Sequence, residues 1–531
     1  MNRRFHRTPS WIVIFSVCLG VVLSYHPAAA VAGDPPDIVI IMADDMGFSD
    51  LGCYGGEIKT PILDGLAAGG LRFSQFYNAA RCCPTRASLL TGLYPHQAGI
   101  GAMVSRGNEP GYLGRLNDNC VTLAEVLRAA GYHTAMTGKW HVTHFDYSAN
   151  PFLHRESWPL QRGFDRFFGT LAGGGSFYDP VSLMRGNEFI EPGGDFYYTH
   201  AINDEAAAFV DQAPADRPLF LYVAHVAPHW PLHALEEDIK RYDGVYDIGW
   251  DQIRLQRHAR LIELGLIDSG TVLSPRSRQV PAWDTADHKP WQARRMAVHA
   301  AMVDSMDQGI GRLIEALKKR GRFDNTLILF LSDNGGSDEV IQGQQTRHGN
   351  FARGGTSPEV MPGPADTYAS YGRPWANASN TPFRLYKKWN HEGGIATPLI
   401  AHWPAGITDK GGIRHQPGHV IDLMATVVDL SGAEYPGSHN GHEITPMEGV
   451  SLRPAFAGEP LQREALYWEH FGQRAIRMGS WKLVGGRNNW ELYNLDQDRT
   501  ELNDLADQHS GRVEQMAAMW QLWADRCQVK K

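Results

Sequence analysis

The feature that most constrains the fold is a set of apolar runs, each followed directly by polar residues. Residues 37–42 (DIVIIM), 219–224 (LFLYVA) and 326–331 (TLILFL) are continuous runs of this kind. A strand with one face in water alternates between apolar and polar residues, whereas a continuous apolar run is typical of a strand buried on both faces. Residues 132–137 form a fourth candidate strand. The sequence therefore predicts an α/β protein with a large, mostly parallel mixed sheet flanked by helices.

Helix signals alternate with these strands. Thr60-Pro61 begins a helix as N-cap and first helical residue, and Gly69 ends it. Thr122 and Glu125 have the spacing of a capping box at the start of a second helix. Residues 293–319 read as one long helix that leads into the 326–331 strand. Residues 232–290 show no clean period, which predicts an insertion or a long loop.

The first 32 residues have the pattern of a secretory signal peptide. Three arginines precede an apolar run over residues 11–25, and the alanines at 28–30 offer a small-residue cleavage site. A membrane anchor is the alternative, but the run is short for a spanning helix. We expect an exported protein, either periplasmic or secreted (lysosomal or extracellular in a eukaryotic host), with no membrane association beyond export.

Two further segments complete the predicted organisation. Residues 33–455 are expected to form the catalytic α/β domain, and residues 456–531 a C-terminal subdomain. The tail contains four short strand-like pieces (465–469, 474–477, 482–484 and 490–493) and a final helix from about 511 to 525. This pattern predicts a small antiparallel sheet with one helix.

Composition and missing motifs exclude several functions. The net charge of −8 comes without a basic run, so nucleic acid is not expected as a partner. The chain also lacks the phosphate-binding loop, the H-E-x-x-H helix and the G-x-S-x-G elbow. Nucleotide-binding, zinc-protease and serine-hydrolase readings therefore have no support.

Polar residues follow the predicted strands where ligands bind in open α/β sheets. Asp44-Asp45 follows the first strand and Asp333-Asn334 the last, supplying hard oxygen ligands that favour Ca²⁺ or Mg²⁺ over zinc. The strand at 132–137 leads to Lys139 and His141, and the strand at 219–224 leads to His229. Lys387 lies in a later segment that precedes a Gly-rich turn. Cations and a proton donor of this kind suit the cleavage of an anionic ester.

The cysteine count leaves one thiol unexplained. Without the leader the chain holds an odd number of cysteines: Cys53, Cys82, Cys83, Cys120 and Cys527. Adjacent cysteines rarely pair with each other, so Cys82 or Cys83 is expected to have another role.

Cys82 begins the segment CCPTRASLLTG, which has the form C-x-P-x-R followed by a helix start of small residues. This segment resembles the sulfatase family, in which the first cysteine of C-x-P-S/T-R is oxidised to formylglycine. The segments at 227–231 (APHWP) and 381–387 (TPFRLYK) resemble its arylsulfatase branch. The resemblance covers almost the whole mature chain, including the tail.

The resemblance implies an alkaline-phosphatase-like fold, the hydrolysis of sulfate monoesters, and maturation by a formylglycine-generating enzyme. It implies one Ca²⁺ ion held by Asp44, Asp45, Cys82, Asp333 and Asn334. It implies a catalytic set of Cys82, Arg86, Lys139, His141, His229 and Lys387.

The resemblance also implies individual roles. Arg86 fixes the hydrated aldehyde, and Asp333 takes the proton of the attacking hydroxyl. Lys139, Lys387 and His229 hold the sulfate oxygens, and His229 or Lys387 protonates the departing alcohol. His141 takes the proton of the second hydroxyl, which expels sulfate.

Two other functions stay open at this point. A phosphonate or phosphate monoesterase of the same superfamily is one, although the C-x-P-T-R segment and a single-metal ligand set argue against it. A non-catalytic binder of sulfated glycans is the other, and the complete set of catalytic residues argues against that. The substrate, a small molecule or a glycan carrying a sulfate ester, is not readable from the sequence.

Overall fold

A computed structural model describes residues 1, 34–145, 153–341, 355–487 and 489–530. The predicted signal peptide, apart from Met1, lies outside these residues. Residues Pro35–Lys531 form one compact unit. Within the described residues, no helix combines the length and apolar character needed to cross a bilayer.

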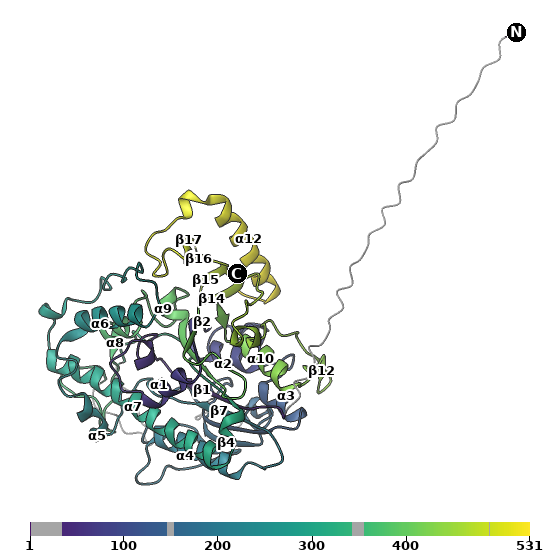
Figure 1. Ribbon diagram of the computed structural model, residues 1–531, viewed down its shortest axis with the longest axis horizontal. Helices are drawn as coiled ribbons and strands as arrows, with labels where there is room; N and C mark the ends of the chain where they lie inside the picture. Colours follow the sequence, from purple (N-terminus) through teal and green to yellow (C-terminus); the bar gives the residue numbers. More distant parts are fainter. Residues whose placement is uncertain (2–33, 146–152, 342–354, 488, 531) are drawn as a thin grey trace. The chain divides into compact units, whose positions relative to one another are not determined.

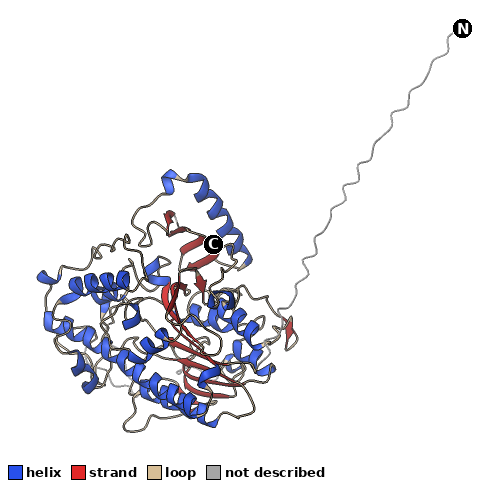
Figure 2. Cartoon of the chain, in the orientation of Figure 1, coloured by secondary structure: helices blue, strands red, loops and turns tan. Residues whose placement is uncertain are grey.

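A mixed sheet runs through the middle of this unit, with helices on both faces (Figures 1 and 2). At its centre β1 (Asp37–Ala43) pairs in parallel with β7 (Leu219–Ala224) and β8 (Thr326–Ser332). Beyond β7 lies β3 (His133–Lys139), which is also parallel, and beside β8 lies the antiparallel β9 (Ala396–His402). The predicted fold class is confirmed. The other strands of the sheet are β2 (Leu71–Tyr77), β4 (Arg166–Thr170), β5 (Leu183–Arg185), β6 (Glu188–Phe189), β10 (Gly412–Arg414) and β11 (Gly418–His419).

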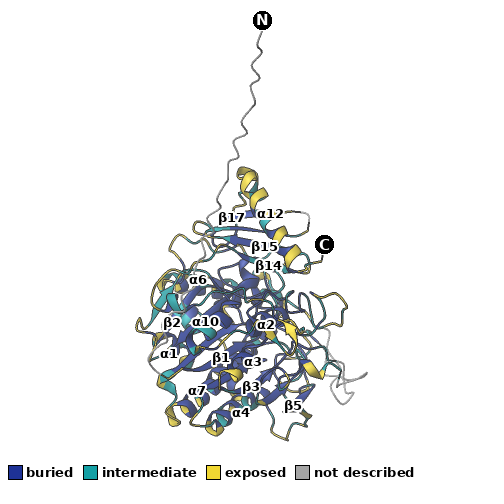
Figure 3. Cartoon of the chain, turned by 90° about the vertical axis from the view of Figure 1, so that its right-hand side faces the viewer, coloured by how far each residue is buried: buried dark blue, intermediate teal, exposed yellow. Residues whose placement is uncertain are grey.

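The central strands are buried on both faces, as their continuous apolar runs predict (Figure 3). Val39 and Ile41 of β1 point into one apolar cluster, and Ile38 and Ile40 point into the other. The first cluster is covered by α1 (Pro61–Ala68), α4 (Tyr198–Gln212) and α7 (Lys289–Lys319). The second is covered by α2 (Cys82–Thr91), α3 (Leu123–Ala129) and α10 (Asp422–Ser431).

The predicted helix starts are confirmed. Pro61 is the first residue of α1, which ends before Gly69. In α3 the capping box is complete, because the Glu125 amide donates to Thr122 Oγ1 at 3.1 Å and the Thr122 amide donates to the Glu125 carboxylate at 2.7 Å. The Thr122 cap satisfies helix-end donors of α3, whereas in α1 the amides of Ile62 and Leu63 donate to Asp307 of α7 at 3.0 and 2.8 Å.

The expectation of an insertion or a long loop over residues 232–290 is wrong in part, because the segment is not all loop. This segment contains α5 (Glu236–Ile239) and the longer α6 (Gly249–Glu263). The apolar periodicity of α6 is hidden because two arginines, Arg254 and Arg257, are buried on its inner face. The Arg257 guanidinium is paired with Asp50 at 2.7 Å, which lets a charged residue occupy a core position.

The C-terminal elements agree with the prediction. The strands β14 (Leu466–His470), β15 (Gln473–Met478), β16 (Trp481–Gly485) and β17 (Glu491–Asn494) form an antiparallel sheet in that order. Helix α12 (Ser510–Arg526) packs on β15 and β16. The boundary at 455/456 stays a prediction. The remaining helices and strands are α8 (Gly372–Ser379), α9 (Glu392–Ile395), α11 (Arg453–Phe456), β12 (Ser438–His439) and β13 (His442–Glu443).

A buried charge network joins the C-terminal sheet to the main sheet. Lys482 of β16 has no exposed side-chain surface and lies 2.9 Å from Glu392 Oε1 and 2.8 Å from Glu501 Oε1. Glu392 also accepts hydrogen bonds from Tyr77 at 3.0 Å and from Arg499 at 3.1 Å. Burial alone raises the pKa of Glu392, but Lys482 and Arg499 more than reverse this and lower the pKa to about 2. The network therefore depends on Lys482 as a buried counter-charge.

We expect Lys482→Met to lower the free energy of unfolding by about 3–5 kcal/mol, because it leaves two carboxylates buried without their shared cation. The folded pKa of Glu392 lies below its ordinary value of 4.5. Its stabilisation is therefore complete above about pH 4.5 and is lost as the pH falls toward about 2. Urea denaturation should show a difference between wild type and variant that shrinks across this window. Lys318→Met, which breaks an exposed pair with Glu315, is the control and should cost less than about 1 kcal/mol. Equal effects of the two substitutions would contradict the role of the network.

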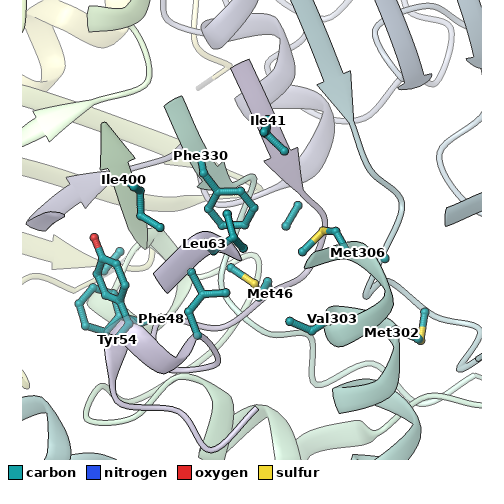
Figure 4. Close-up of a cluster of buried hydrophobic side chains, with 14 of the residues drawn as sticks. Ile41, Met46, Phe48, Tyr54, Leu63, Met302, Val303, Met306, Phe330 and Ile400 are labelled. Atoms are coloured by element: carbon teal, nitrogen blue, oxygen red, sulfur yellow. The ribbon is translucent and has the colours of Figure 1, made fainter. Parts of the chain in front are cut away.

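The loop after β1 is anchored in the apolar cluster between the sheet and helices α1 and α7 (Figure 4). Met46 and Phe48 of this loop are buried, and they lie in the same cluster as Phe330 of β8 and Ile400 of β9. The loop begins with Asp44 and Asp45, so packing of its apolar residues fixes where these two carboxylates lie.

Candidate active site

The predicted site residues meet at one edge of the sheet. The strand order places β8, β1, β7 and β3 side by side and in parallel, so their carboxyl ends share that edge. Strand β9 is antiparallel to β8, so β9 begins at the edge where β8 ends. The segment that carries Lys387 precedes β9 and therefore reaches the same edge. This topology gathers side chains that are up to about 350 positions apart in the sequence: Asp44, Asp45, Lys139, His141, His229, Asp333, Asn334 and Lys387.

Asp44, Asp45, Asp333 and Asn334 form a compact buried group. The Asn334 amide nitrogen donates to Asp45 Oδ1 at 2.6 Å, and the Asp45 backbone amide donates to Asp333 Oδ1 at 3.2 Å. Lys139 Nζ lies 2.5 Å from Asp44 Oδ2. Asp45 has a φ of 64°, a left-handed conformation that is unusual outside glycine. Strain of this kind persists where the surrounding structure fixes it, commonly at functional sites.

This group fits a hard divalent cation. Among the described residues, Asp44 Oδ1 and Asn334 Oδ1 are buried and accept no hydrogen bond, although buried oxygens normally do. Burial and the neighbouring charge of Asp44 raise the pKa of Asp333, which shows that negative charge is crowded here. Ligand atoms of Asp44, Asp45 and His229 also lie within 4.8 Å of one another. Three carboxylates and an amide oxygen, with unused lone pairs on Asp44 and Asn334, are hard donors of the kind that Ca²⁺ or Mg²⁺ requires.

Cys82 is the first residue of α2 and points into the same region. It is almost fully buried, at 2 % exposure, and Arg86 lies one turn further along the helix. The Arg86 guanidinium donates to Asp333 Oδ2 at 2.8 Å and to the Lys139 carbonyl at 3.0 Å. A hydrogen bond with Cys83 and the charge on Lys139 hold the pKa of the Cys82 thiol well below its usual range, against the effect of burial. The helix N-terminus and the two cations thus favour negative charge at position 82.

His141 faces the two cysteines. Its Nε2 lies 3.3 Å from Cys83 Sγ, and one ligand atom each of Cys82, Cys83 and His141 lie within 4.8 Å of one another. Burial and the charge of Lys139 lower the pKa of His141 to about 4, although Cys82 opposes this shift. A buried neutral imidazole is able to accept a proton at neutral pH.

Lys387 and His229 lie on the other side of the acidic group. Lys387 Nζ is 2.8 Å from Asp45 Oδ1 and 3.6 Å from Glu339 Oε2. Burial by itself lowers the pKa of Lys387, but Asp45 and Glu339 more than reverse this and raise it. His229 Nε2 is 3.6 Å from Asp45 Oδ2, and its Nδ1 lies 2.6 Å from the Trp230 carbonyl. The carbonyl accepts a hydrogen bond from Nδ1–H, and the other ring nitrogen, Nε2, faces the site.

Two glycines that the sequence analysis did not single out shape this centre. A Cβ at Gly173 would lie 2.1 Å from the His141 ring, and one at Gly174 would lie 3.1 Å from the His229 ring. The loop after β4 therefore has to be free of side chains where it passes the two histidines. The triplet Gly173-Gly174-Gly175 was the available signal for such a close approach.

Glu339 and Cys83 are also neighbours of the site that the sequence did not reveal. Glu339 accepts a hydrogen bond from Trp230 at 2.9 Å and lies 3.4 Å from Arg81. In the sequence, Glu339 follows Asp333-Asn334 within a polar stretch. Nothing in that pattern distinguishes Glu339 from a solvent-exposed acid. Cys83 was expected only to stand beside the motif cysteine, yet its sulfur lies against His141.

All five described cysteines are free thiols: Cys53, Cys82, Cys83, Cys120 and Cys527. The odd count therefore does not arise from a disulfide pattern within the described residues.

Comparison with known proteins places the fold among alkaline-phosphatase-like hydrolases. The family model for sulfatases matches residues 36–433, and the model for the C-terminal region of N-sulphoglucosamine sulphohydrolase matches residues 383–526. The chain belongs to the sulfatase family, and it is a sulfuric ester hydrolase.

Three relatives illustrate the range of similarity. The chain is 34% identical to an uncharacterized sulfatase of Schizosaccharomyces pombe, covering 91% of this chain and 92% of that protein. It is 36% identical to an arylsulfatase of Klebsiella aerogenes, covering 80% of this chain and 93% of that protein. Among solved structures it is similar to Ps i-CgsB in complex with a neocarrahexaose, with a TM-score of 0.66, 27% identity, and coverage of 92% and 93%.

Proposed function

We propose that the protein hydrolyses sulfate monoesters in the manner of an arylsulfatase, using a formylglycine made from Cys82 and one bound calcium ion. The observation that carries this proposal is the position of Cys82. Cys82 begins a helix, and Arg86 lies one turn further along it. One ligand atom each of Cys82 and His141 lie within 4.8 Å of each other, at the sheet edge that also holds the buried acidic group. An unmodified structural cysteine has no need of such a surrounding.

Asp44, Asp45, Asp333 and Asn334, with the modified Cys82, would hold the ion. Bound there, Ca²⁺ supplies positive charge that polarises the nucleophile and the sulfate oxygens. The hydrated aldehyde supplies one hydroxyl for attack on sulfur and a second whose loss of a proton releases sulfate. A serine at this position would lack that second hydroxyl, so its sulfate ester would persist.

The chain's own residues move protons and hold charge around these groups. Asp333 takes the proton of the attacking hydroxyl, since its carboxylate lies in the same buried group as the other proposed ligands and accepts a hydrogen bond from Arg86 at 2.8 Å. Arg86, which already donates to Asp333, orients the hydroxyls and offsets charge. His141 is neutral, so it accepts the proton of the second hydroxyl.

Three residues would hold the sulfate group and assist the leaving alcohol. Lys139 and Lys387 are buried cations that now contact Asp44 and Asp45, and they would bind sulfate oxygens when the ion takes up the carboxylate charge. His229 presents Nε2 to the site, and since Nδ1 is bonded to the Trp230 carbonyl, it would protonate the leaving oxygen as the imidazolium, a form that the Asp45 carboxylate at 3.6 Å favours. Lys387 is the alternative donor.

The test of this function is a pair of rates measured on the metal-loaded protein. We expect 4-nitrophenyl sulfate to be hydrolysed at least about 100-fold faster than 4-nitrophenyl phosphate. The proposed site has one metal ion, and its nucleophile carries a second hydroxyl that releases sulfate from the covalent intermediate. Metal analysis should give one calcium per chain, and chelation should remove activity that calcium restores. Two metals per chain, or faster cleavage of the phosphate, would favour the phosphatase alternative. An unmodified Cys82 in protein that turns over neither ester would favour the glycan binder.

We also propose that the protein is exported through the leader at residues 1–32, and that a formylglycine-generating enzyme modifies Cys82. Sulfated glycans are part of the proposed substrate range, supported by the relative that was solved with a neocarrahexaose.

A further inference from the structure

A cavity of about 640 Å³ lies between the C-terminal sheet, α12 and the segment around residue 102. Its volume is within the range of ligand sites, about 300–1,000 Å³. Aromatic side chains line it together with cationic ones, among them Phe471, Trp520, Arg474 and Arg487. No role in the chemistry proposed above has been given to any of these residues.

Two segments that line the cavity also contact the neighbours of Cys82. Phe471 lines it, and the same ring lies 5.9 Å from the guanidinium of Arg81, the residue directly before Cys82. Ala102 also lines it, and the following residue, Met103, has its sulfur 3.8 Å from Cys83 Sγ. Two separate chain segments therefore connect the cavity wall to the start of α2.

The turn between β14 and β15 makes this connection. It carries His470, which is buried, and Phe471, which is 57 % exposed with a φ of 51°. Within the described residues, both ring nitrogens of His470 lack a hydrogen-bond partner. The Phe471 ring contacts Arg81 and His470, and its exposed remainder forms part of the cavity wall, where it can contact a ligand.

The charges in the cavity favour an anion. Its three cations, Arg474, Arg487 and Lys530, outnumber its two acids, Glu469 and Asp525. Glu469 also lies 2.9 Å from His96 Nε2, and Asp525 accepts a hydrogen bond from Gln521 at 3.0 Å. Arg474 lies 3.9 Å from the centroid of the Trp490 ring and donates only to backbone carbonyls. Neither Arg474 nor Arg487 forms an ion pair with any residue in the described ranges. Guanidinium groups beside aromatic rings suit sulfate or carboxylate groups on a sugar ring.

We infer that this cavity binds an anionic sugar unit linked to the sulfated unit held at Cys82, so that the substrate is an oligosaccharide with more than one acidic group. This inference rests on the proposed function, because it takes the sulfate ester to lie at Cys82. It assigns Phe471 and Arg487 as specificity residues, with no part in the cleavage step.

The test is competition against 4-nitrophenyl sulfate by hexasaccharides of chondroitin sulfate and of carrageenan, with inorganic sulfate and a neutral cellohexaose as references. For the better of the two competitors, Arg487→Glu and Phe471→Ala should each raise the inhibition constant about tenfold. The inhibition constant of inorganic sulfate and the kcat for the aryl ester should stay the same. Arg512→Glu is the matched control, because Arg512 is also exposed and lies over a tryptophan ring of the same subdomain, but outside the cavity.

Equal shifts in Arg487→Glu and Arg512→Glu would overturn the inference, as would competition by cellohexaose as strong as that of the anionic hexasaccharides. These outcomes would leave the proposed function intact, since wild type would still cleave the aryl ester. If wild type cleaves no sulfate ester, the same hexasaccharides are titrated calorimetrically into wild type, Arg487→Glu and Arg512→Glu. This titration measures binding independently of ester cleavage. Binding lost only in Arg487→Glu would then support an anion site, and unchanged binding would refute it.

Discussion

Cys82→Ala is expected to reduce turnover of 4-nitrophenyl sulfate by at least about 10⁴-fold, because it removes the nucleophile and not merely a contact. Cys83→Ala should keep most of the activity. The register of the motif decides between the two, since Cys82 stands two residues before Pro84 and four before Arg86. The structure agrees with a supporting place for Cys83, whose sulfur contacts His141 and Met103.

The measurement pairs kinetics with the mass of the tryptic peptide that contains residue 82. In active wild type the peptide should carry an aldehyde at position 82 and a free thiol at position 83. The Cys83→Ala protein is the matched control, because it removes a thiol of the same size and burial one residue away. An intact Cys82 thiol in fully active protein would end the proposal, and so would equal losses in the two variants.

His141→Ala should release about one equivalent of phenol per active site and then stall, because attack on sulfur does not need this base whereas expulsion of sulfate does. The neutral state of the buried His141 ring supports this assignment. Rapid-quench kinetics with the activated ester should show a burst without steady turnover.

His229→Ala should behave differently. It should show no burst, and its losses should be largest, about 100-fold or more, for esters of alcohols with a high pKa, which need a proton to leave. Esters of acidic phenols should lose less, since the phenolate departs unaided. A series of aryl sulfates of graded phenol pKa therefore separates the two histidines. If both variants slow alike, with equal sensitivity to the leaving group and no burst, the assignment is wrong and Lys387 becomes the candidate donor.

Much of this protein follows from short stretches of sequence. The continuous apolar runs determined which strands are buried on both faces, since a strand covered on both sides has no polar positions to reveal. The capping box determined where helix α3 begins, because a cap is a local hydrogen-bonding requirement, and Pro61 marked the start of α1 because its fixed φ suits the first helical position. The polar residues at the strand ends could also be identified from sequence, because each comes directly after its own strand in the chain.

Other features depend on contacts that no local pattern encodes. Helix α6 was missed because its buried Arg257 is compensated by Asp50, a residue about 200 positions away. The approach of Gly173 to His141 and of Phe471 to Arg81 likewise joins distant segments. The sequence by itself determined the kinds of groups available for chemistry and the strands that carry them. Only the tertiary structure decided which charges share one buried space and what else borders it, because burial and pairing are properties of the assembled neighbours and not of any single segment.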